Sequence, residues 1–263
     1  MKDLKISIIQ SDLYWENIEA NLANFEEKIW AIPDQTDLII LPEMFSTGFT
    51  MNVVKLSEPP YFKTFRWMVQ MADQKKAVIM GSYIVNEKDN YFNRLYAVYP
   101  DGTYRYYDKK HLFALGKEQD FFKPGEEKTI IIIKGWNICP LICYDLRFPV
   151  WSRLNPNGPN LFEYDILIYI ASWPKMRINS WDTLLSARAI ENQSYCIGVN
   201  RIGIDGNDLE YPGHSVVYDF FGDQQNHLGT TADICTTRLS REGLDLFRSN
   251  FPFQKEADFF NFC

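Results

Sequence analysis

The residue best suited to chemistry is Cys143, which ends a mostly apolar run over residues 138–142. Such a run, followed by Tyr144 and a proline at position 149, is typical of a strand that delivers a thiol to a sharp turn. In α/β folds, ligands bind at the carboxyl edge of the sheet, and the N–H after a nucleophile can point at an oxyanion. The pattern predicts a nucleophilic thiol, whereas the common alternative for a single cysteine is a small buried hydrophobe.

Two distant segments carry groups that could activate this thiol, since a nucleophile needs a base and a charge partner that meet it only in the fold. Glu43 follows an apolar run over residues 37–41 and a proline. Lys109 and Lys110 follow an aromatic run over residues 104–107. Successive side chains on a strand point to opposite faces, so at most one of the two lysines can enter a site.

The motifs around these residues resemble one enzyme superfamily. The glutamate after Leu41-Pro42, Lys109 in Lys-x-His-Leu-Phe and Cys143 in Cys-Tyr-Asp-Leu-Arg-Phe resemble the Glu-Lys-Cys triad of the nitrilase (carbon–nitrogen hydrolase) superfamily. Further segments are similar to family segments: Glu118 with Pro124-Gly125, and residues 171–174, 187–193 and 200–203. The similarity spans nearly the whole chain and is greatest to the omega-amidase branch, which hydrolyses the terminal amide of 2-oxoglutaramate and 2-oxosuccinamate.

The resemblance implies a role for each matching residue. Glu43 would be the general base, Lys109 would support the thiolate and the oxyanion, and Cys143 would form a thioester. The family motif places the ammonium two residues before a histidine, which selects Lys109 and leaves Lys110 pointing outward. Glu118 would support catalysis by orienting Lys109 or the substrate.

Four residues near the thiol have less specific expectations. Tyr144 would contribute its backbone N–H to the oxyanion hole while its ring packs in the core, and Trp173 would form a pocket wall or pack. Asp145 and Arg147 are expected to form a structural ion pair at the turn. Arg177 is a candidate for binding a substrate carboxylate, although its position in the sequence does not show that it turns inward.

Composition and charge narrow the class of protein. A chain of 263 residues with 46% hydrophobic and 16% aromatic residues suits a single large α/β domain over residues 1–263. A net charge of −7 argues against nonspecific binding to nucleic acid. Five cysteines without a Cys-x-x-Cys pair, and charged residues directly after Met1, indicate a cytoplasmic protein. The apolar runs are too short to cross a bilayer.

No cofactor and no metal are implied. His111, His214 and His227 are too scattered for the usual zinc spacings, and Cys139 with Cys143 supplies only two sulfurs. His214 stands where the family pattern suggests a smaller or acidic residue. Because that segment could border the site, the departure leaves the substrate preference open.

Short apolar runs alternate with amphipathic segments and hairpins, which indicates an α/β fold. Strands are expected at residues 5–10, 38–41, 77–83, 92–99, 103–107, 129–133, 136–143, 166–171, 195–200 and 215–218, and helices at residues 17–30, 62–74, 181–192 and 240–247. This order predicts an α-β-β-α sandwich of two mixed sheets flanked by helices, which the resemblance also implies. Pro140 cannot donate to a sheet, so we expect a bulge there.

The partners and the rival functions follow from the same residues. The small-molecule partner is an amide, and the resemblance implies a homodimer or higher homo-oligomer with residues 148–151 as a candidate contact. One rival is a Cys-His protease that uses His111 or His214. A second is a non-enzymatic interaction scaffold, and a third is a carbon–nitrogen hydrolase with another amide specificity.

Overall fold

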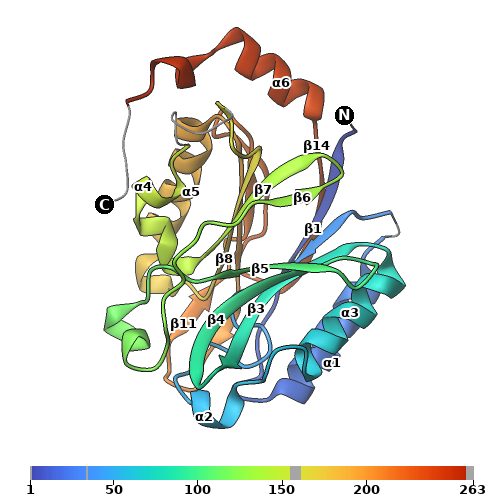
Figure 1. Ribbon diagram of the computed structural model, residues 1–263, viewed down its shortest axis with the longest axis vertical. Coiled ribbons are helices and arrows are strands. Elements are labelled where there is room, and N and C mark those ends of the chain that lie inside the picture. The colour runs from blue at the N-terminus through green and yellow to red at the C-terminus, as the bar shows by residue number, and fades with distance from the viewer. Residues whose placement is uncertain (1, 34, 155–160, 259–263) are drawn as a thin grey trace.

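Two six-stranded mixed sheets pack face to face and carry helices on their outer faces (Figure 1). The structure is a computed structural model that describes residues 2–33, 35–154 and 161–258. The α-β-β-α sandwich predicted from the sequence is confirmed. Cys263, one of the five cysteines, lies outside the described residues.

The first sheet has the strand order β14-β1-β2-β3-β4-β5. Its strands are β14 (Asp233–Leu239), β1 (Leu4–Gln10), β2 (Leu38–Ile40), β3 (Val78–Glu87), β4 (Asn90–Val98) and β5 (Tyr104–Asp108). The pairings β1–β2 and β2–β3 are parallel and the others are antiparallel. Every residue of β2 is buried, because this short apolar strand lies between two neighbours and two packed faces.

The second sheet has the strand order β13-β12-β9-β8-β7-β6. Its strands are β13 (Gln224–His227), β12 (Val216–Tyr218), β9 (Tyr195–Asn200), β8 (Ile166–Ala171), β7 (Trp136–Ile142) and β6 (Ile131–Ile133). The pairings β7–β8 and β8–β9 are parallel and the others are antiparallel. A separate hairpin joins β10 (Ile202–Ile204) to β11 (Glu210–Pro212).

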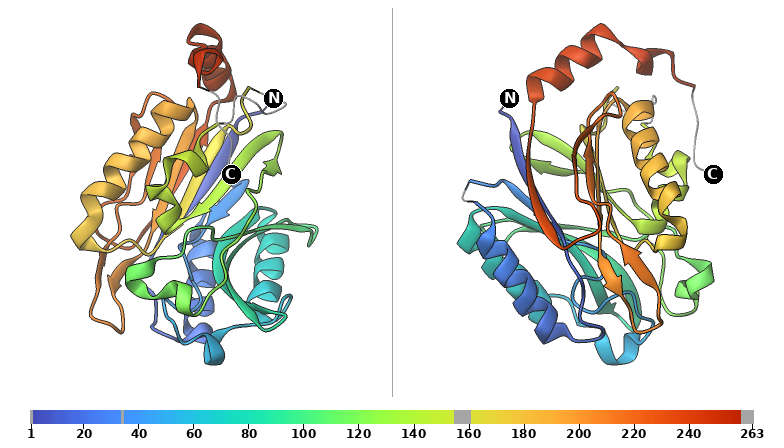
Figure 2. Two further views of the ribbon diagram at one scale, coloured as in Figure 1. Left: turned by 60° about the vertical axis from the view of Figure 1, so that its left-hand side comes forward. Right: turned by 180° about the vertical axis from the view of Figure 1, so that it is seen from behind.

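The helices cover the two outer faces and one end of the sandwich (Figure 2). They are α1 (Ile18–Ala31), α2 (Val53–Leu56), α3 (Lys63–Lys75), α4 (Pro149–Ser152), α5 (Ile178–Asn192) and α6 (Arg241–Asn250). In α1, the apolar residues Leu22, Phe25 and Ile29 recur at spacings of three and four and are buried. The side chain of Asn17 accepts a hydrogen bond from the N–H of Ala20 and caps this helix.

The parallel strand β8 ends close to the end of β2, because the N–H of Ser172, after β8, donates to the carboxylate of Glu43, after β2. The bulge expected at Pro140 is wrong, because β7 pairs with β8 from Ile138 to Ile142 without a shift in register. Strand β6 pairs with β7 only as far as Ile138, so it does not lie opposite Pro140 and needs no N–H from it.

The segment 148–151 was expected to contact the partner in a homodimer, but its aromatic rings form contacts within the chain. Phe148 stacks on His111 at 3.8 Å between ring centroids, and the Nε1–H of Trp151 donates to the hydroxyl of Tyr107 over 3.0 Å. Val150 is 52% exposed. The homodimer therefore stays a prediction. In the part of the chain that the structure describes, no helix is both long enough and apolar enough to span a membrane.

Candidate active site

Cys143 lies directly after β7 and begins a 3-10 helix, Cys143–Arg147. Its backbone is left-handed, with a φ of 44°, which is uncommon for a residue with a side chain and typical of a nucleophile at a sharp turn. The residue is 9% exposed, and its Sγ lies 3.9 Å from the carbonyl oxygen of Ser172, which follows β8. The turn thus aims the thiol at the carboxyl end of the neighbouring parallel strand.

Asp145 shapes this turn instead of pairing with Arg147. Its carboxylate accepts hydrogen bonds from the N–H of Ile142 at 3.0 Å, the hydroxyl of Tyr107 at 2.8 Å and two nitrogens of His111 at 2.8 and 3.0 Å. The ion pair expected between Asp145 and Arg147 is wrong, because these donors around the turn occupy the carboxylate instead.

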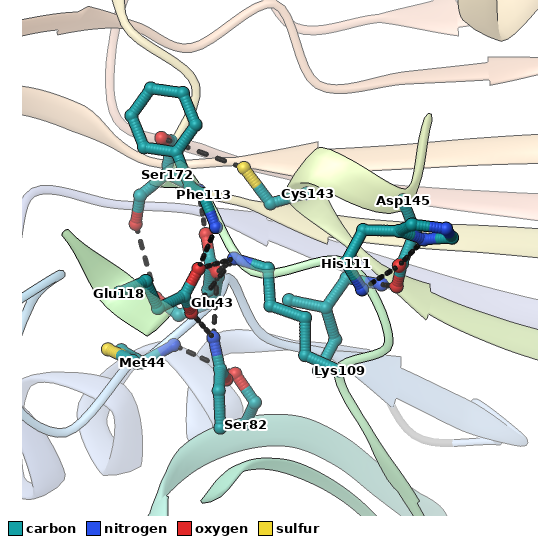
Figure 3. A network of polar contacts seen from close by, with 12 residues as sticks. Glu43, Met44, Ser82, Lys109, His111, Phe113, Glu118, Cys143, Asp145 and Ser172 are labelled. Carbon is teal, nitrogen blue, oxygen red and sulfur yellow. Dashed lines mark hydrogen bonds and ion pairs between the residues drawn. The ribbon is translucent and has the colours of Figure 1, made fainter. Parts of the chain in front are cut away.

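Glu43 follows β2 and is fully buried. Three donors hold its carboxylate: Nζ of Lys109 at 2.9 Å, Nδ2 of Asn93 at 2.8 Å and the backbone N–H of Ser172 at 2.8 Å. Figure 3 shows Glu43, Lys109 and Ser172 converging beside the thiol of Cys143. The carboxylate of Glu43 is therefore held in a fixed position, buried from solvent between the two sheets.

Lys109 and Glu118 complete a buried charged cluster. Nζ of Lys109 lies 2.8 and 3.1 Å from the two carboxylate oxygens of Glu118, which also accepts from the N–H of Phe113 at 2.7 Å. Burial alone would lower the pKa of Lys109, but the carboxylates of Glu118 and Glu43 raise it above its ordinary value. Burial raises the pKa of Glu118, and the charge of Lys109 opposes that rise. Lys109 is therefore a permanent cation.

The backbone around Lys109 explains the glycine of the Pro124-Gly125 motif. The N–H of Lys109 donates to the carbonyl of Asn93 at 3.1 Å, and its own carbonyl accepts from the N–H of Gly125 at 2.8 Å. A Cβ on Gly125 would lie only 2.1 Å from the carbonyl oxygen of Asp108, so only glycine fits. Lys110 lies on the other side, half-buried, with its Nζ 5.4 Å from the centroid of the Trp151 ring.

The thiol of Cys143 is protonated in this environment. Burial raises its pKa well above the ordinary value, and the nearby carboxylate of Glu43 adds to the rise. The charge of Lys109 and the contact with the Ser172 carbonyl oppose it with smaller effects. Ionisation of the thiol therefore needs a proton acceptor, and the carboxylate of Glu43 lies close enough to affect the pKa of Cys143.

A cavity of about 630 Å³ opens over the thiol, and its lining combines aromatic side chains with charged and polar ones. Trp173 forms a wall, held by a bond from its N–H to the Asn200 side chain at 2.7 Å. The ring of Tyr144 also lines the cavity and packs against Phe113 and Phe148, so the expectation that it packs in the core is wrong. The N–H of Tyr144 lies in the first turn of the 3-10 helix, where such groups are free to bind an anion.

Two arginines line the cavity without a carboxylate partner among the described residues, Arg147 and Arg177. The guanidinium of Arg147 lies 4.9 Å from the Trp173 ring and donates to the hydroxyl of Ser180 at 3.1 Å. That of Arg177 lies 5.1 Å from the Phe113 ring. The rings hold both cations at the cavity, which is therefore suited to an anionic ligand.

The two carboxylates in the cavity wall are already satisfied. Glu16 accepts from the hydroxyl of Thr50 at 2.6 Å, and Asp205 accepts from the hydroxyl of Tyr211 at 2.8 Å and from backbone N–H groups. Among the described residues, neither acid forms an ion pair with Arg147 or Arg177. The cavity lining thus has more basic side chains than acidic ones.

Several groups of the candidate site were not predicted from the sequence. Asn93 donates to both Glu43 and Glu118, the latter at 3.3 Å, and Asn200 binds the backbone of Trp173. A signal for Asn93 existed, because a polar amide interrupts the apolar strand β4 and buried amides need partners. The contribution of Ser172 comes from its backbone, which no residue type could reveal.

The histidines do not contact the thiol. His111 bonds Asp145 and stacks on Phe148, while Nδ1 of His214 lies 3.0 Å from the carboxylate of Asp182. The protease alternative requires a histidine bonded to Cys143, and both candidates have other partners. The four cysteines in the described ranges are free thiols.

Comparison with known protein sequences gives matches over the whole chain. The family profile described as carbon-nitrogen hydrolase matches residues 5–249. The chain is 41% identical to omega-amidase YafV of Yersinia enterocolitica over 99% of both chains. It is 31% identical to 2-oxoglutaramate amidase of Bacillus subtilis, over 82% of this chain and 83% of the relative.

Solved structures agree with these matches. A Xanthomonas campestris protein of the CN-hydrolase superfamily superposes with a TM-score of 0.97 and 37% identity over 100% of both chains. A Saccharomyces cerevisiae member of branch 10 of the nitrilase superfamily superposes with a TM-score of 0.84 and 25% identity over 95% of both chains.

Proposed function

The chain belongs to the carbon–nitrogen hydrolase family and is a hydrolytic enzyme that acts on amides, and we propose that its substrates are short 2-oxo dicarboxylic acid monoamides. The expected substrates are 2-oxoglutaramate and 2-oxosuccinamate, and the products are the dicarboxylate and ammonia. The names of the relatives, omega-amidase and 2-oxoglutaramate amidase, support this choice.

In the first half of the proposed reaction, the enzyme forms a thioester. Glu43 takes the proton of the Cys143 thiol, and the sulfur attacks the amide carbonyl. The oxygen of the tetrahedral intermediate gains a negative charge, which Nζ of Lys109 and the N–H of Tyr144 stabilise. Glu43 returns its proton to the leaving nitrogen, the carbon–nitrogen bond breaks and ammonia leaves.

In the second half, water hydrolyses the thioester. Glu43 takes a proton from the water, whose oxygen attacks the thioester carbonyl, and the same two donors stabilise the second oxyanion. The carbon–sulfur bond breaks, the sulfur regains a proton and the dicarboxylate is released. Glu118 keeps Lys109 in place throughout, supported by its contacts of 2.8 and 3.1 Å.

The observation that carries the substrate proposal is the pair Arg147 and Arg177 in the cavity wall. Each is held over an aromatic ring and each faces the cavity that contains the Cys143 thiol. A 2-oxo acid amide has a carboxylate at the end opposite its amide. A guanidinium can bind that carboxylate through two parallel hydrogen bonds, while the thiol meets the amide.

The test is a kinetic panel of 2-oxoglutaramate, 2-oxosuccinamate, glutamine, asparagine, simple nitriles and uncharged amides of similar length. Each hydrogen bond to a charged group contributes about 1.5–3 kcal/mol, so kcat/KM for the 2-oxo acid amides should exceed that for uncharged amides by about tenfold or more. Equal turnover would leave the amidase and reject this substrate class, in favour of another amide specificity.

The two arginines can be tested separately. Arg147→Gln and Arg177→Gln should each raise KM for 2-oxoglutaramate by about tenfold and leave hydrolysis of uncharged amides nearly unchanged. Arg105→Gln, an exposed residue of β5 outside this cavity, is the control with the same change in charge. An equal loss on all amides would mean that the arginines only support the fold.

We also propose that the enzyme works in the cytoplasm as a homodimer or higher homo-oligomer. A reducing compartment suits a nucleophilic thiol, and the four cysteines of the described ranges are free. Light scattering on the purified protein tests the assembly, and a monomer at micromolar concentration would reject it.

A further inference from the structure

A second cluster of chemically active side chains lies apart from the thiol, formed by Asp182, His214 and His227. The ligand atoms of all three lie within 4.8 Å of one another. Nδ1 of His214 lies 3.0 and 3.2 Å from the two carboxylate oxygens of Asp182, and the two imidazole rings meet edge to face at 5.2 Å. His227 is exposed and the other two are half-buried, so the cluster is open to solvent.

Three separate elements hold the cluster. Asp182 is on α5, and its carbonyl accepts from the hydroxyl of Tyr218 at 3.3 Å. His214 precedes β12, and its carbonyl accepts from Nε1 of Trp181 at 2.9 Å. His227 ends β13, opposite Val216 of β12.

The backbone around His214 is held by hydrogen bonds. Its φ is 61°, in the left-handed region, and its N–H donates to the carbonyl of Gly229 at 3.2 Å. The next residue, Ser215, is bound through its N–H to the side chain of Gln10 at 2.9 Å. The imidazole therefore needs little reorganisation in order to bind a ligand.

The residue types and their separations suit one class of ion. Two imidazoles and one carboxylate are ligands of zinc, cobalt, nickel and ferrous iron, and they leave positions open for water. Ligand bonds of about 2.0–2.1 Å in a tetrahedron place neighbouring ligand atoms about 3.3 Å apart. The contacts of 3.0 and 3.2 Å between His214 and Asp182 are close to that edge length. The exposed His227 side chain can turn to complete the set.

We propose that Asp182, His214 and His227 bind a divalent transition-metal ion of the zinc class, at a site separate from the amidase centre. Such an ion would join α5 to the hairpin of β12 and β13 and stabilise the folded chain in proportion to its occupancy. The ion takes no part in amide hydrolysis. The Trp181 ring, which packs on Trp173 at 5.5 Å and bonds the carbonyl of His214, lies between the two sites.

The test is a titration of untagged, metal-free, full-length protein with cobalt and with zinc. We expect saturable binding of about one ion per chain at micromolar metal, a rise in Tm, and a cobalt spectrum with d–d bands and without thiolate-to-cobalt charge transfer. Charge-transfer bands would place the metal on a cysteine and overturn the proposal, as would the absence of saturable binding.

Variants locate the site. His227→Gln, Asp182→Asn and His214→Asn should each weaken binding by at least about tenfold. Asparagine suits position 214 because it tolerates a left-handed backbone, and His227 is exposed, so at least these two variants should fold. Asp223→Asn, at an exposed turn of the same hairpin, is the control with the same charge change as Asp182→Asn. Unchanged affinity in the His227 and His214 variants would overturn the proposal.

Discussion

The two sheets have the same order of strand directions, yet they contribute different chemical groups to the candidate active site. Each shows one antiparallel, two parallel and two antiparallel pairings, from β14 to β5 in the first and from β6 to β13 in the second. The first sheet positions the carboxyl group of Glu43 and the amine of Lys109, and the second positions the thiol of Cys143. Strand direction thus fixes where groups meet, while residue type decides what each contributes.

Because its residues come from both sheets, the geometry of the candidate active site depends on how the sheets pack together. The bond from the N–H of Ser172 to the carboxylate of Glu43 joins them directly at 2.8 Å. The charges of one sheet should therefore control the reactivity of a thiol on the other. Four variants test that relation, ordered by the size of the change expected in the rate that is measured for each.

Cys143→Ala should abolish ammonia release, by at least about a thousandfold, because it removes the nucleophile and leaves both charges of the first sheet in place. Steady-state kinetics on 2-oxoglutaramate measure the loss, and circular dichroism checks the fold. Cys139→Ala, at a buried thiol of the preceding strand β7, is the matched control. Turnover within about tenfold of the wild type would reject the mechanism.

Lys109→Ala should lower kcat by about a hundredfold to a thousandfold, because an oxyanion donor is lost. It should also lower Tm, since Glu43 and Glu118 would then face each other without a cation in a buried place. Lys110→Ala is the control, with an expected change within about twofold because Lys110 lies over Trp151 outside the cluster. Equal effects of the two variants would show that Lys109 has no special role.

Asn93→Ala should lower kcat by about tenfold. Its amide donates to Glu43 and Glu118, and loss of a bond to a buried charged group costs about 1.5–3 kcal/mol. Asn90→Ala, on the same strand, is the control for the amide, because the side chain of Asn90 donates to the carbonyl of Lys88 and not to the charged cluster. An unchanged kcat would mean that the lysine and the Ser172 N–H alone hold the base.

Glu43→Gln should make the thiol more reactive toward alkylation while it removes amidase activity. The carboxylate raises the pKa of Cys143 and the charge of Lys109 lowers it, so neutralising residue 43 should lower that pKa. The iodoacetamide rate measured against pH should then begin to rise at a lower pH than in the wild type, with a gain of severalfold near pH 8. If the rise in the iodoacetamide rate moved to higher pH, Glu43 would not be raising the pKa of Cys143.

The sequence indicated which groups at strand ends meet in the fold. Glu43 and Cys143 follow apolar runs and Lys109 follows an aromatic one, and the structure brings these three residues together with Glu118. The interpretation of Asp145 and Arg147 failed, because within a tight turn the carboxylate satisfies backbone N–H groups that the residue types do not show.

Two other features were beyond the sequence for physical reasons. Strand β14 was missed, because Asp233–Leu239 has few apolar residues and is held by its pairing with β1. The residues of the second cluster come from three elements: Asp182 lies on α5, His214 precedes β12 and His227 ends β13. Only the packing of α5 beside the hairpin of β12 and β13 makes these three residues neighbours.

The cluster of Glu43, Lys109 and Glu118 has a consequence for the order of folding. Its members are 66 and 9 residues apart, and burying any one of them without its partners costs several kcal/mol. A folding chain should therefore keep all three in water until the sheets have packed, and then bury them in one cooperative step. Mutations in the cluster should accelerate unfolding and leave the folding rate nearly unchanged.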